Sequence, residues 1–306
     1  MSGRGGFDDL LLHAANPTTK IREAGSRENW KGRLNHLLSA SAAFLKRNQQ
    51  QSSEPREPQM VVFPIADEPN NASLAAWPVV EERERQSASS YWLVTQPAHA
   101  ALSGELAASL REDLFGAIDD VVARSIALHD SGWSMADAEQ IQQLRADPKL
   151  KPKSFLEFAP DQFLRAWTAS IDTAEKFAPI GGFLVSRHFE RISMRNGDKD
   201  QSKLQSFRSR EKQRQQRLKP KIQMEDSALE KLVDALQFCD LLSLYLCCGS
   251  GRSIKFDCPK LTLSRSGDEY RLEPFPFREH GQFSFSALKH PADGRPKSGA
   301  TFYINV

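Results

Sequence analysis

Polar residues that stand within apolar helical stripes constrain this chain more than any other feature of its sequence. Four segments repeat apolar residues every three or four positions, which is the spacing of one face of an α-helix. Each stripe also contains one ionisable side chain. The stripes are His99 with Leu102, Leu106 and Leu110; His129 with Ile118, Val122 and Ser125; His188 with Leu184 and Ile192; and Asp240 with Leu229, Leu232 or Val233, Leu236 and Leu244. The sequence therefore predicts four helices that direct three imidazoles and one carboxylate into the interior.

Asp240 is the member of this set that most needs a partner. A single histidine on an apolar helix face is usually a hydrogen-bonded core residue. A buried carboxylate without a partner costs several kcal/mol, so it must be neutralised, paired or bound to a cation. The histidine stripes contain no lysine or arginine that could pair with it. A divalent metal ion would account for all four burials, because imidazole and carboxylate groups are good ligands for such ions.

The dipeptide His129-Asp130 adds a second carboxylate where its helix is expected to end. Ser131-Gly132-Trp133 follows, which is typical of a helix end beside a large aromatic residue. Adjacent residues of a helix point about 100° apart, so both side chains reach one ion only if it rests against the helix surface. We therefore expect Asp130 to join the same site.

Strands are predicted on both sides of the helical segment. Apolar or alternating runs predict strands at residues 60–65, at 91–96 and within 260–306. The helical core is expected over residues 97–248, beginning at a proline that suits a first helical turn. We expect a mostly α fold, a helical bundle with a small antiparallel β-sheet made from the N-terminal strands and the C-terminal segment (α+β).

Composition divides the chain of 306 residues into a tail and one domain. Residues 1–58 mix short apolar patches with Gly, Ser, Gln and Arg and predict a disordered N-terminal tail, which leaves residues 59–306 as the domain. A basic, Gln-rich run at residues 195–221 is expected to be an insertion in that domain. We favour a solvated helical extension or a flexible insertion over a lid or a nucleic-acid contact made through phosphates.

Charge, hydropathy and cysteine content exclude several classes of protein. The formal net charge is +2, which gives no global argument for binding nucleic acid. No run of apolar residues is long enough for a transmembrane helix, and the N-terminus lacks the parts of a signal peptide. The four cysteines form no CxxC pair, so neither a disulfide framework nor a thiolate zinc site is indicated. We expect a reduced, cytoplasmic protein that does not associate with membranes.

The order of these residues resembles a known superfamily. His99, then His129-Asp130, then Asp240 resembles the H…HD…D signature of the HD-domain metal-dependent phosphohydrolases. The strings TQPAHAALSGELA, ALHDSGW, LVSRHF and QFCDLLSLYLC more closely resemble an uncharacterised bacterial branch of HD-like proteins, a domain of unknown function. The resemblance implies an HD-like bundle over residues 60–306 in which His99, His129, Asp130 and Asp240 are metal ligands. It also implies that His188 is a further site residue, either a second-metal ligand or a phosphate contact.

Two imidazoles and two carboxylates suit Mn, Fe, Co, Ni or Zn without indicating which. We expect a metal-activated water to attack a phosphate ester, with Asp130 or Asp240 orienting the water and His188 stabilising the leaving oxygen or the phosphate. The expected substrate is a small phosphorylated molecule. Trp133, Arg187 and Arg191 are candidate substrate contacts, although a packing aromatic and solvated arginines are the simpler interpretations.

Two other functions stay open at this point. The first is a non-catalytic metal- or ligand-binding protein built on the same scaffold. The second is an interaction protein that acts through the basic run, residues 195–221. Absence of hydrolytic turnover would separate the binding protein from an enzyme. The interaction protein predicts that binding persists when His129 and Asp130 are replaced.

Overall fold

A computed structural model describes most of the chain after residue 90. The described residues are 65–66, 91–150, 152, 155, 158–194, 201–247, 253–257, 259–266, 269–290 and 299–306. The expected tail at residues 1–58 lies outside them, and the expected first strand is described only from its last residue. Within this part of the chain, no helix combines the length and apolarity needed to cross a membrane.

Helices occupy the chain from residue 96 to residue 247. They are α3 (Gln96–Ala108), α4 (Glu112–Phe115), α5 (Asp120–Ala127), α6 (Ser134–Ala146), α7 (Pro160–Phe177), α8 (Pro179–Ser193), α9 (Gln201–Leu218) and α10 (Asp226–Cys247), with short 3-10 turns η2 (Ser131–Trp133) and η4 (Lys219–Lys221). Local sequence explains several starts. The Thr95 side chain accepts a hydrogen bond from the Ala98 N–H, and Asp119 does the same for Val122. Prolines begin α7 and α8, where a missing N–H has no cost.

A seven-stranded sheet completes the fold. Its strands are β1 (Ile65–Ala66), β2 (Tyr91–Leu93), β3 (Ile254–Asp257), β4 (Lys260–Ser266), β5 (Glu269–Glu273), β6 (Gln282–His290) and β7 (Gly299–Asn305), in the order β1-β2-β6-β7-β5-β4-β3. These elements confirm the expected mostly α fold with a sheet formed from both sides of the helical segment. The sheet is mixed, because β7 lies between β6 and β5 and runs parallel to β5, with the single residue pair Glu269↔Asn305.

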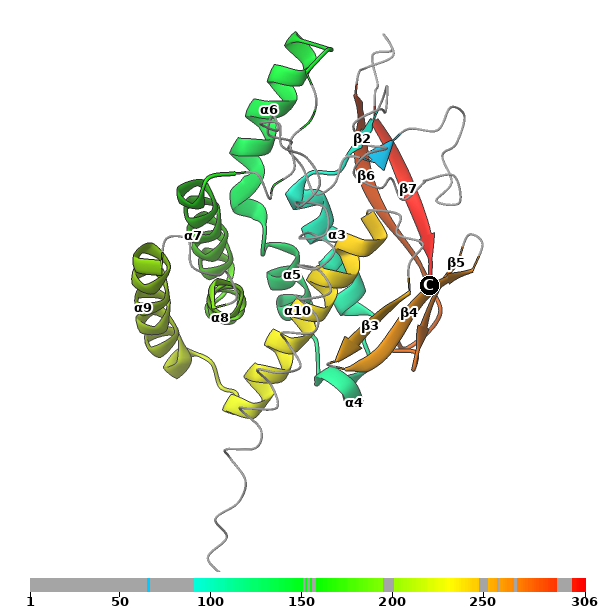
Figure 1. Ribbon diagram of the computed structural model, residues 1–306. Coiled ribbons are helices and arrows are strands. Elements are labelled where there is room, and N and C mark those ends of the chain that lie inside the picture. Colours follow the sequence, from blue (N-terminus) through cyan, green and yellow to red (C-terminus); the bar gives the residue numbers. More distant parts are fainter. Residues whose placement is uncertain are drawn as a thin grey trace, which may run out of the picture.

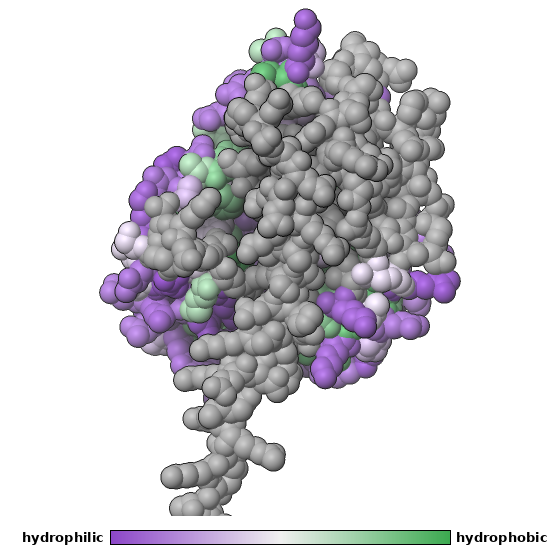
Figure 2. All heavy atoms as spheres, in the orientation of Figure 1, coloured by the Kyte–Doolittle hydropathy of each residue, from purple (hydrophilic) through white to green (hydrophobic). Residues whose placement is uncertain are grey.

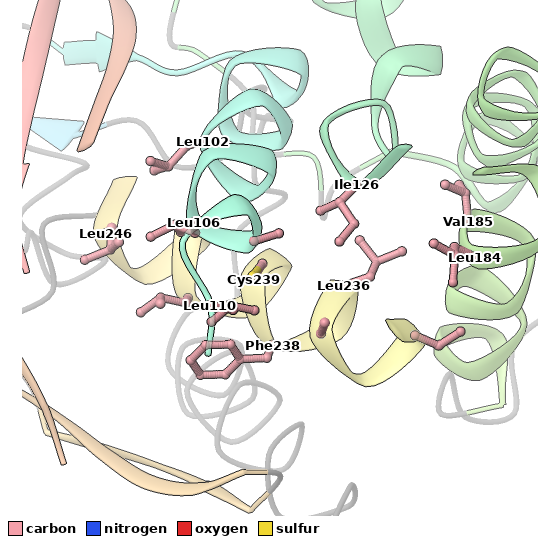
Figure 3. Packing of buried hydrophobic residues seen from close by; sticks show 14 of the residues in the cluster. Leu102, Leu106, Leu110, Ile126, Leu184, Val185, Leu236, Phe238, Cys239 and Leu246 are labelled. Atoms are coloured by element: carbon pink, nitrogen blue, oxygen red, sulfur yellow. The ribbon is translucent and has the colours of Figure 1, made fainter. Parts of the chain in front are cut away.

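The helices lie on one side of the sheet, and the long helix α10 passes through the middle of the molecule (Figure 1). Helix α3 packs against α10, against α5 and against strand β6. Side chains of α3, α5, α8 and α10 share one apolar interior, which includes Leu102, Ile126, Leu184 and Leu236 (Figure 3). The predicted apolar stripes therefore face a common core, and their polar members are carried into it.

Two glycines set how closely these helices approach. A Cβ atom at Gly104 of α3 would lie 2.6 Å from the Ala127 Cβ of α5. At Gly132, a Cβ atom would lie 2.1 Å from the Ala166 carbonyl oxygen of α7, and the Gly132 N–H donates to Ser170. Because neither position has room for a methyl group, both glycines allow contacts that bring the end of α5 close to α3 and α7.

The described part of the basic run is a packed helix rather than a flexible insertion. Leu204, Phe207 and Leu218 of α9 are buried, and α9 packs on α8. Glu211 is also fully buried and paired with Arg214, so a charged residue occupies one position of the apolar stripe. The charged residue at this position hides the helical periodicity in the sequence.

Three ion pairs and one hydrogen bond connect α9 to α7, and we call these four pairs the α7–α9 ladder. The pairs are Asp161–Lys203, Thr168–Arg210, Asp172–Arg214 and Glu175–Arg217. Each joins residues 42 positions apart, so the two helices run in the same direction. Hydrophilic residues accordingly gather over this part of the surface (Figure 2).

Candidate metal centre

Five residues selected from the sequence meet between the helices. His99 comes from α3, His129 and Asp130 directly follow α5, His188 comes from α8 and Asp240 from α10. The three histidine side chains are each 1% exposed, whereas those of Asp130 and Asp240 are 11% and 17% exposed. The carboxylates therefore form the more open side of the cluster.

The distances between donor atoms fit a single bound ion. His99 Nε2 lies 3.1 Å from Asp130 Oδ2 and 3.5 Å from Asp240 Oδ1. His129 Nε2 lies 3.3 Å from Asp240 Oδ1 and 3.7 Å from Asp130 Oδ2. Ligands about 2.1 Å from one ion stand about 3.0 to 3.4 Å apart at right-angled or tetrahedral geometry. The His99, His129 and Asp240 group could therefore bind a metal ion.

His129 is oriented so that its inner nitrogen needs a cation. Its Nδ1–H donates to the Ile126 carbonyl at 2.8 Å, which leaves Nε2 without a proton in the neutral ring. That Nε2 atom is buried and makes no hydrogen bond of good geometry within the described residues, yet it faces two carboxylates. A lone pair opposite negative oxygens is unfavourable, so this nitrogen must bind either a proton or a metal ion.

Charges within the centre shift the pKa of its members in opposite directions. Burial alone would lower the pKa of His129, but the charges of Asp130 and Asp240 outweigh it and raise the pKa to about 9. Burial alone would raise the pKa of Asp240, but the hydrogen bond and charge of His129, together with His188 and His99, hold it well below its usual range. Without metal, the centre therefore holds a proton on His129 in place of a metal cation.

His188 approaches the opposite oxygen of the same carboxylate. Its Nε2 lies 3.5 Å from Asp240 Oδ2, whereas His99 and His129 face Oδ1. The Asp240 carboxylate thus has one oxygen for the metal group and one for His188. This arrangement gives His188 a position at the edge of the centre, next to its more open side.

Asp137 is a buried carboxylate that the sequence analysis missed. It lies on α6 and accepts a hydrogen bond from the Gln96 N–H at the start of α3, at 2.8 Å. Burial raises its pKa to about 7; the Gln96 N–H opposes this shift and the Asp130 charge adds to it. Asp137 shares a helical stripe with Ile141 and Leu144, the same signal that identified the other polar residues.

The three candidate substrate contacts have other roles in the structure. The Arg187 guanidinium pairs with Glu190 and Glu230, and that of Arg191 pairs with Glu230 and Asp234. These pairs engage both arginines along the contact between α8 and α10. Trp133 is 2% exposed and packs edge-on against Phe158 and Phe163, with ring centroids 5.5 Å and 5.2 Å away. It is therefore a packing aromatic, as the simpler interpretation has it.

Comparison with known proteins identifies the family. Residues 84–288 match the family described as protein of unknown function DUF3891, which is more than half of the chain. The chain belongs to this family. The DUF3891 match includes all five residues of the centre. No curated protein and no solved structure matches the chain.

Proposed function

We propose that this DUF3891 protein is a metal-dependent phosphohydrolase of the HD-like kind. The observation that carries the proposal is the meeting of His99, His129, Asp130 and Asp240 donor atoms at ligand-to-ligand distances. These residues occur along the chain in the order H…HD…D, which resembles the HD-domain signature. The unpaired Nε2 atom of buried His129 gives independent support, since its surroundings call for a cation.

The proposed ligands are His99, His129, Asp130 and Asp240, and the ion is Mn, Fe, Co, Ni or Zn. When bound, such an ion acidifies a water molecule and neutralises negative charge on a phosphoryl oxygen. In the protein, the imidazoles form the buried side of the centre and the carboxylates form its more open side. Substrate would approach from that open side.

Two residues have proposed roles in the chemistry. The Asp130 carboxylate accepts a hydrogen bond from the attacking water and orients it. His188 stands at Asp240 Oδ2 and either donates a proton to the leaving oxygen or bonds to the phosphate. Replacement of His188 should therefore reduce turnover more than it reduces metal content.

A small phosphorylated molecule is the proposed substrate class, in preference to a nucleic acid. Lys203, Arg210, Arg214 and Arg217 pair with groups of α7 or α9, so these cations are already neutralised or bonded within the fold. Phosphate binding by these four side chains would require those bonds to open. The alternative of a non-catalytic metal-binding protein shares the same centre and differs only in turnover.

Elemental analysis of the purified protein tests the centre first. We expect about one or two transition-metal ions per chain in the wild type, and their loss in the Asp240→Ala variant, because both oxygens of this carboxylate face histidines of the centre. Asp234→Ala is the matched control, since Asp234 lies on the same helix but pairs with Arg191 outside the centre. Metal that survives Asp240→Ala, or that is absent from the wild type after reconstitution with each of the five metals, would overturn the proposed centre.

Hydrolysis assays then separate an enzyme from a binding protein. Metal-loaded protein is offered p-nitrophenyl phosphate, bis-p-nitrophenyl phosphate and a panel of nucleotides and sugar phosphates. We expect turnover of at least one ester that is lost in Asp240→Ala and kept in Asp234→Ala. A loaded protein that hydrolyses none of these esters would favour the non-catalytic alternative.

A further inference from the structure

The outer nitrogens of His99 and His129 meet different kinds of hydrogen-bond partner. His129 Nδ1 faces the Ile126 main-chain carbonyl, which can only accept. His99 Nδ1 instead lies 2.6 Å from the hydroxyl oxygen of Ser243, which can either donate or accept. The carbonyl therefore fixes the neutral tautomer of His129, whereas the hydroxyl leaves both tautomers of His99 available.

Ser243 belongs to a buried pair of hydroxyl groups at the contact between α3 and α10. Its oxygen lies 2.8 Å from that of Ser103, and both residues are fully buried. Ser103 stands one helical turn after His99, and Ser243 stands one turn after Asp240. Helices α3 and α10 thus each supply one proposed ligand and one hydroxyl of this pair.

Ser243 can complete a hydrogen-bond arrangement for each His99 tautomer. In the first, Ser243 donates to the Asp240 carbonyl at 2.9 Å and accepts from His99 Nδ1–H. The Ser103 hydroxyl can donate to Ser243 or to the His99 and Cys239 carbonyls. His99 Nε2 then presents a lone pair to the centre. In the second, the Ser243 hydroxyl turns and donates to Nδ1, and His99 Nε2–H donates to Asp130 Oδ2 at 3.1 Å.

The second arrangement suits a centre without metal, and the first suits a centre with metal. Without metal, a proton on Nε2 gives the Asp130 carboxylate a hydrogen bond in a buried place. With metal, Nε2 must be free of protons to act as a ligand. The ring has the same number of protons in both arrangements.

We propose that Ser243 is a positioning residue that lets His99 exchange its tautomer when the centre takes up a metal ion. This inference rests on the metal centre of the proposed function. On loading, the His99 ring releases its Nε2 proton to solvent and takes up one solvent proton at Nδ1, so its proton count does not change, while the Ser243 hydroxyl turns from Nδ1 to the Asp240 carbonyl. The Ser103 hydroxyl has an acceptor in both states, because it reaches Ser243 at 2.8 Å and the His99 and Cys239 carbonyls at 3.1 Å and 3.3 Å. His129 keeps its Nδ1 proton throughout.

NMR spectroscopy of protein labelled with ¹⁵N in its histidine rings tests the proposal directly. The ring ¹⁵N shifts distinguish a protonated nitrogen, a free nitrogen and a metal-bound nitrogen, and zinc is a suitable diamagnetic probe. We expect His99 to carry its proton on Nε2 without zinc and on Nδ1 with zinc. His129 should show a protonated Nδ1 in both samples and is the internal control. Assignment uses His99→Asn and His129→Asn variants.

Zinc affinity of serine variants gives a second readout, measured by competition with a chromophoric chelator. Ser243→Ala removes the acceptor for the His99 Nδ1–H in the loaded state, so zinc affinity should fall about 10- to 100-fold. Ser103→Ala should have a smaller effect, because it leaves the His99–Ser243 bond in place. Ser193→Ala is the control, since that buried hydroxyl donates to the Glu190 carbonyl of its own helix.

The outcomes separate this inference from the proposed function. If the wild type binds zinc but the His99 tautomer does not change, or if Ser243→Ala binds zinc as tightly as Ser193→Ala, the inference is wrong and the metal centre stands. If the wild type binds neither zinc nor any of the other four metals, both are wrong. Should Ser243→Ala fail to fold, the wild-type spectra alone decide.

Discussion

Charged side chains gather in two regions of this protein, and the two regions are built from different residue types. In the centre, three imidazoles face the carboxylates of Asp130 and Asp240 within the interior. In the three ion pairs of the α7–α9 ladder, lysine and arginine face carboxylates near the surface, and the side chains of the Asp161–Lys203 pair are 56% and 49% exposed. Lysine and arginine are permanent cations, so the ladder is neutralised by the protein itself. Imidazoles can be neutral, which leaves the carboxylates of the centre to a metal ion or to protons.

The position of α9 depends on the apolar residues beneath the ladder more than on the ladder itself. The ladder lies over an apolar contact, in which Phe207 of α9 stacks near Trp167 of α7 with ring centroids 5.7 Å apart. Exposed ion pairs contribute little free energy, whereas a buried aromatic contributes several kcal/mol. We therefore expect the apolar side of α9 to fix its position and the ladder to add little.

Phe207→Ala should have the largest effect on stability. Loss of a fully buried phenyl ring should lower the free energy of unfolding by about 3 to 5 kcal/mol. Urea denaturation followed by circular dichroism measures this, and metal content per folded chain should stay at the wild-type value. A loss below about 1 kcal/mol would mean that ionic contacts hold α9, contrary to the comparison.

The pH dependence of the metal-free protein should be intermediate in size. Because the pKa of His129 is raised from 6.5 to about 9 in the folded state, its stabilising effect is complete below pH 6.5. That stability is lost as the pH rises through 9, and we expect a decrease of about 1 to 3 kcal/mol in the free energy of unfolding. Chemical denaturation at a series of pH values measures it.

Two controls sharpen this pH test. His129→Asn should remove the decrease, because the titrating ring is gone. A saturating metal ion should also remove it, because the ion replaces the proton on Nε2. An unchanged decrease in His129→Asn would assign the effect to another group.

Lys203→Ala should have the smallest effect. The Lys203–Asp161 pair is exposed, so its loss should lower the free energy of unfolding by no more than about 0.5 kcal/mol. The difference should shrink further in high salt, where exposed charges are screened. A larger loss, measured by urea denaturation in low salt, would show that the ladder is a cooperative network.

The sequence was sufficient to predict the fold class and to select the residues that meet in the centre. His99, His129, His188 and Asp240 were detectable because each interrupts an apolar stripe at regular helical spacing. Asp137 has the same signal but was overlooked, since its stripe contains only Ile141 and Leu144 on an otherwise polar helix. The pairing of Ser243 with Ser103 could not be predicted, because it depends on how α3 and α10 contact each other.

Two features of the chain depend on contacts between helices that the sequence does not show. Arg187 and Arg191 lie beside His188 in sequence, but adjacent helix positions point in different directions, and these two side chains face carboxylates of α10. The basic run has buried Glu211 in its apolar stripe, so composition alone suggested an insertion. In both cases the partner that neutralises the charge comes from another helix, and sequence spacing carries no information about it.

The single residue pair between β5 and β7 divides the sheet into two hydrogen-bonded halves. Strands β1, β2, β6 and β7 form the half that α3 contacts, and β3, β4 and β5 form a separate meander. Beyond the Glu269↔Asn305 pair the two strands separate, and a groove of about 1020 Å³ lies along β5 and the beginning of β6. The segment after β5 joins the meander to the end of α3 instead, because the Arg111 N–H donates to the Pro276 carbonyl and the Arg278 N–H donates to the Ser109 carbonyl. A load applied to the meander would therefore reach the helix that carries His99 through this segment rather than across the sheet.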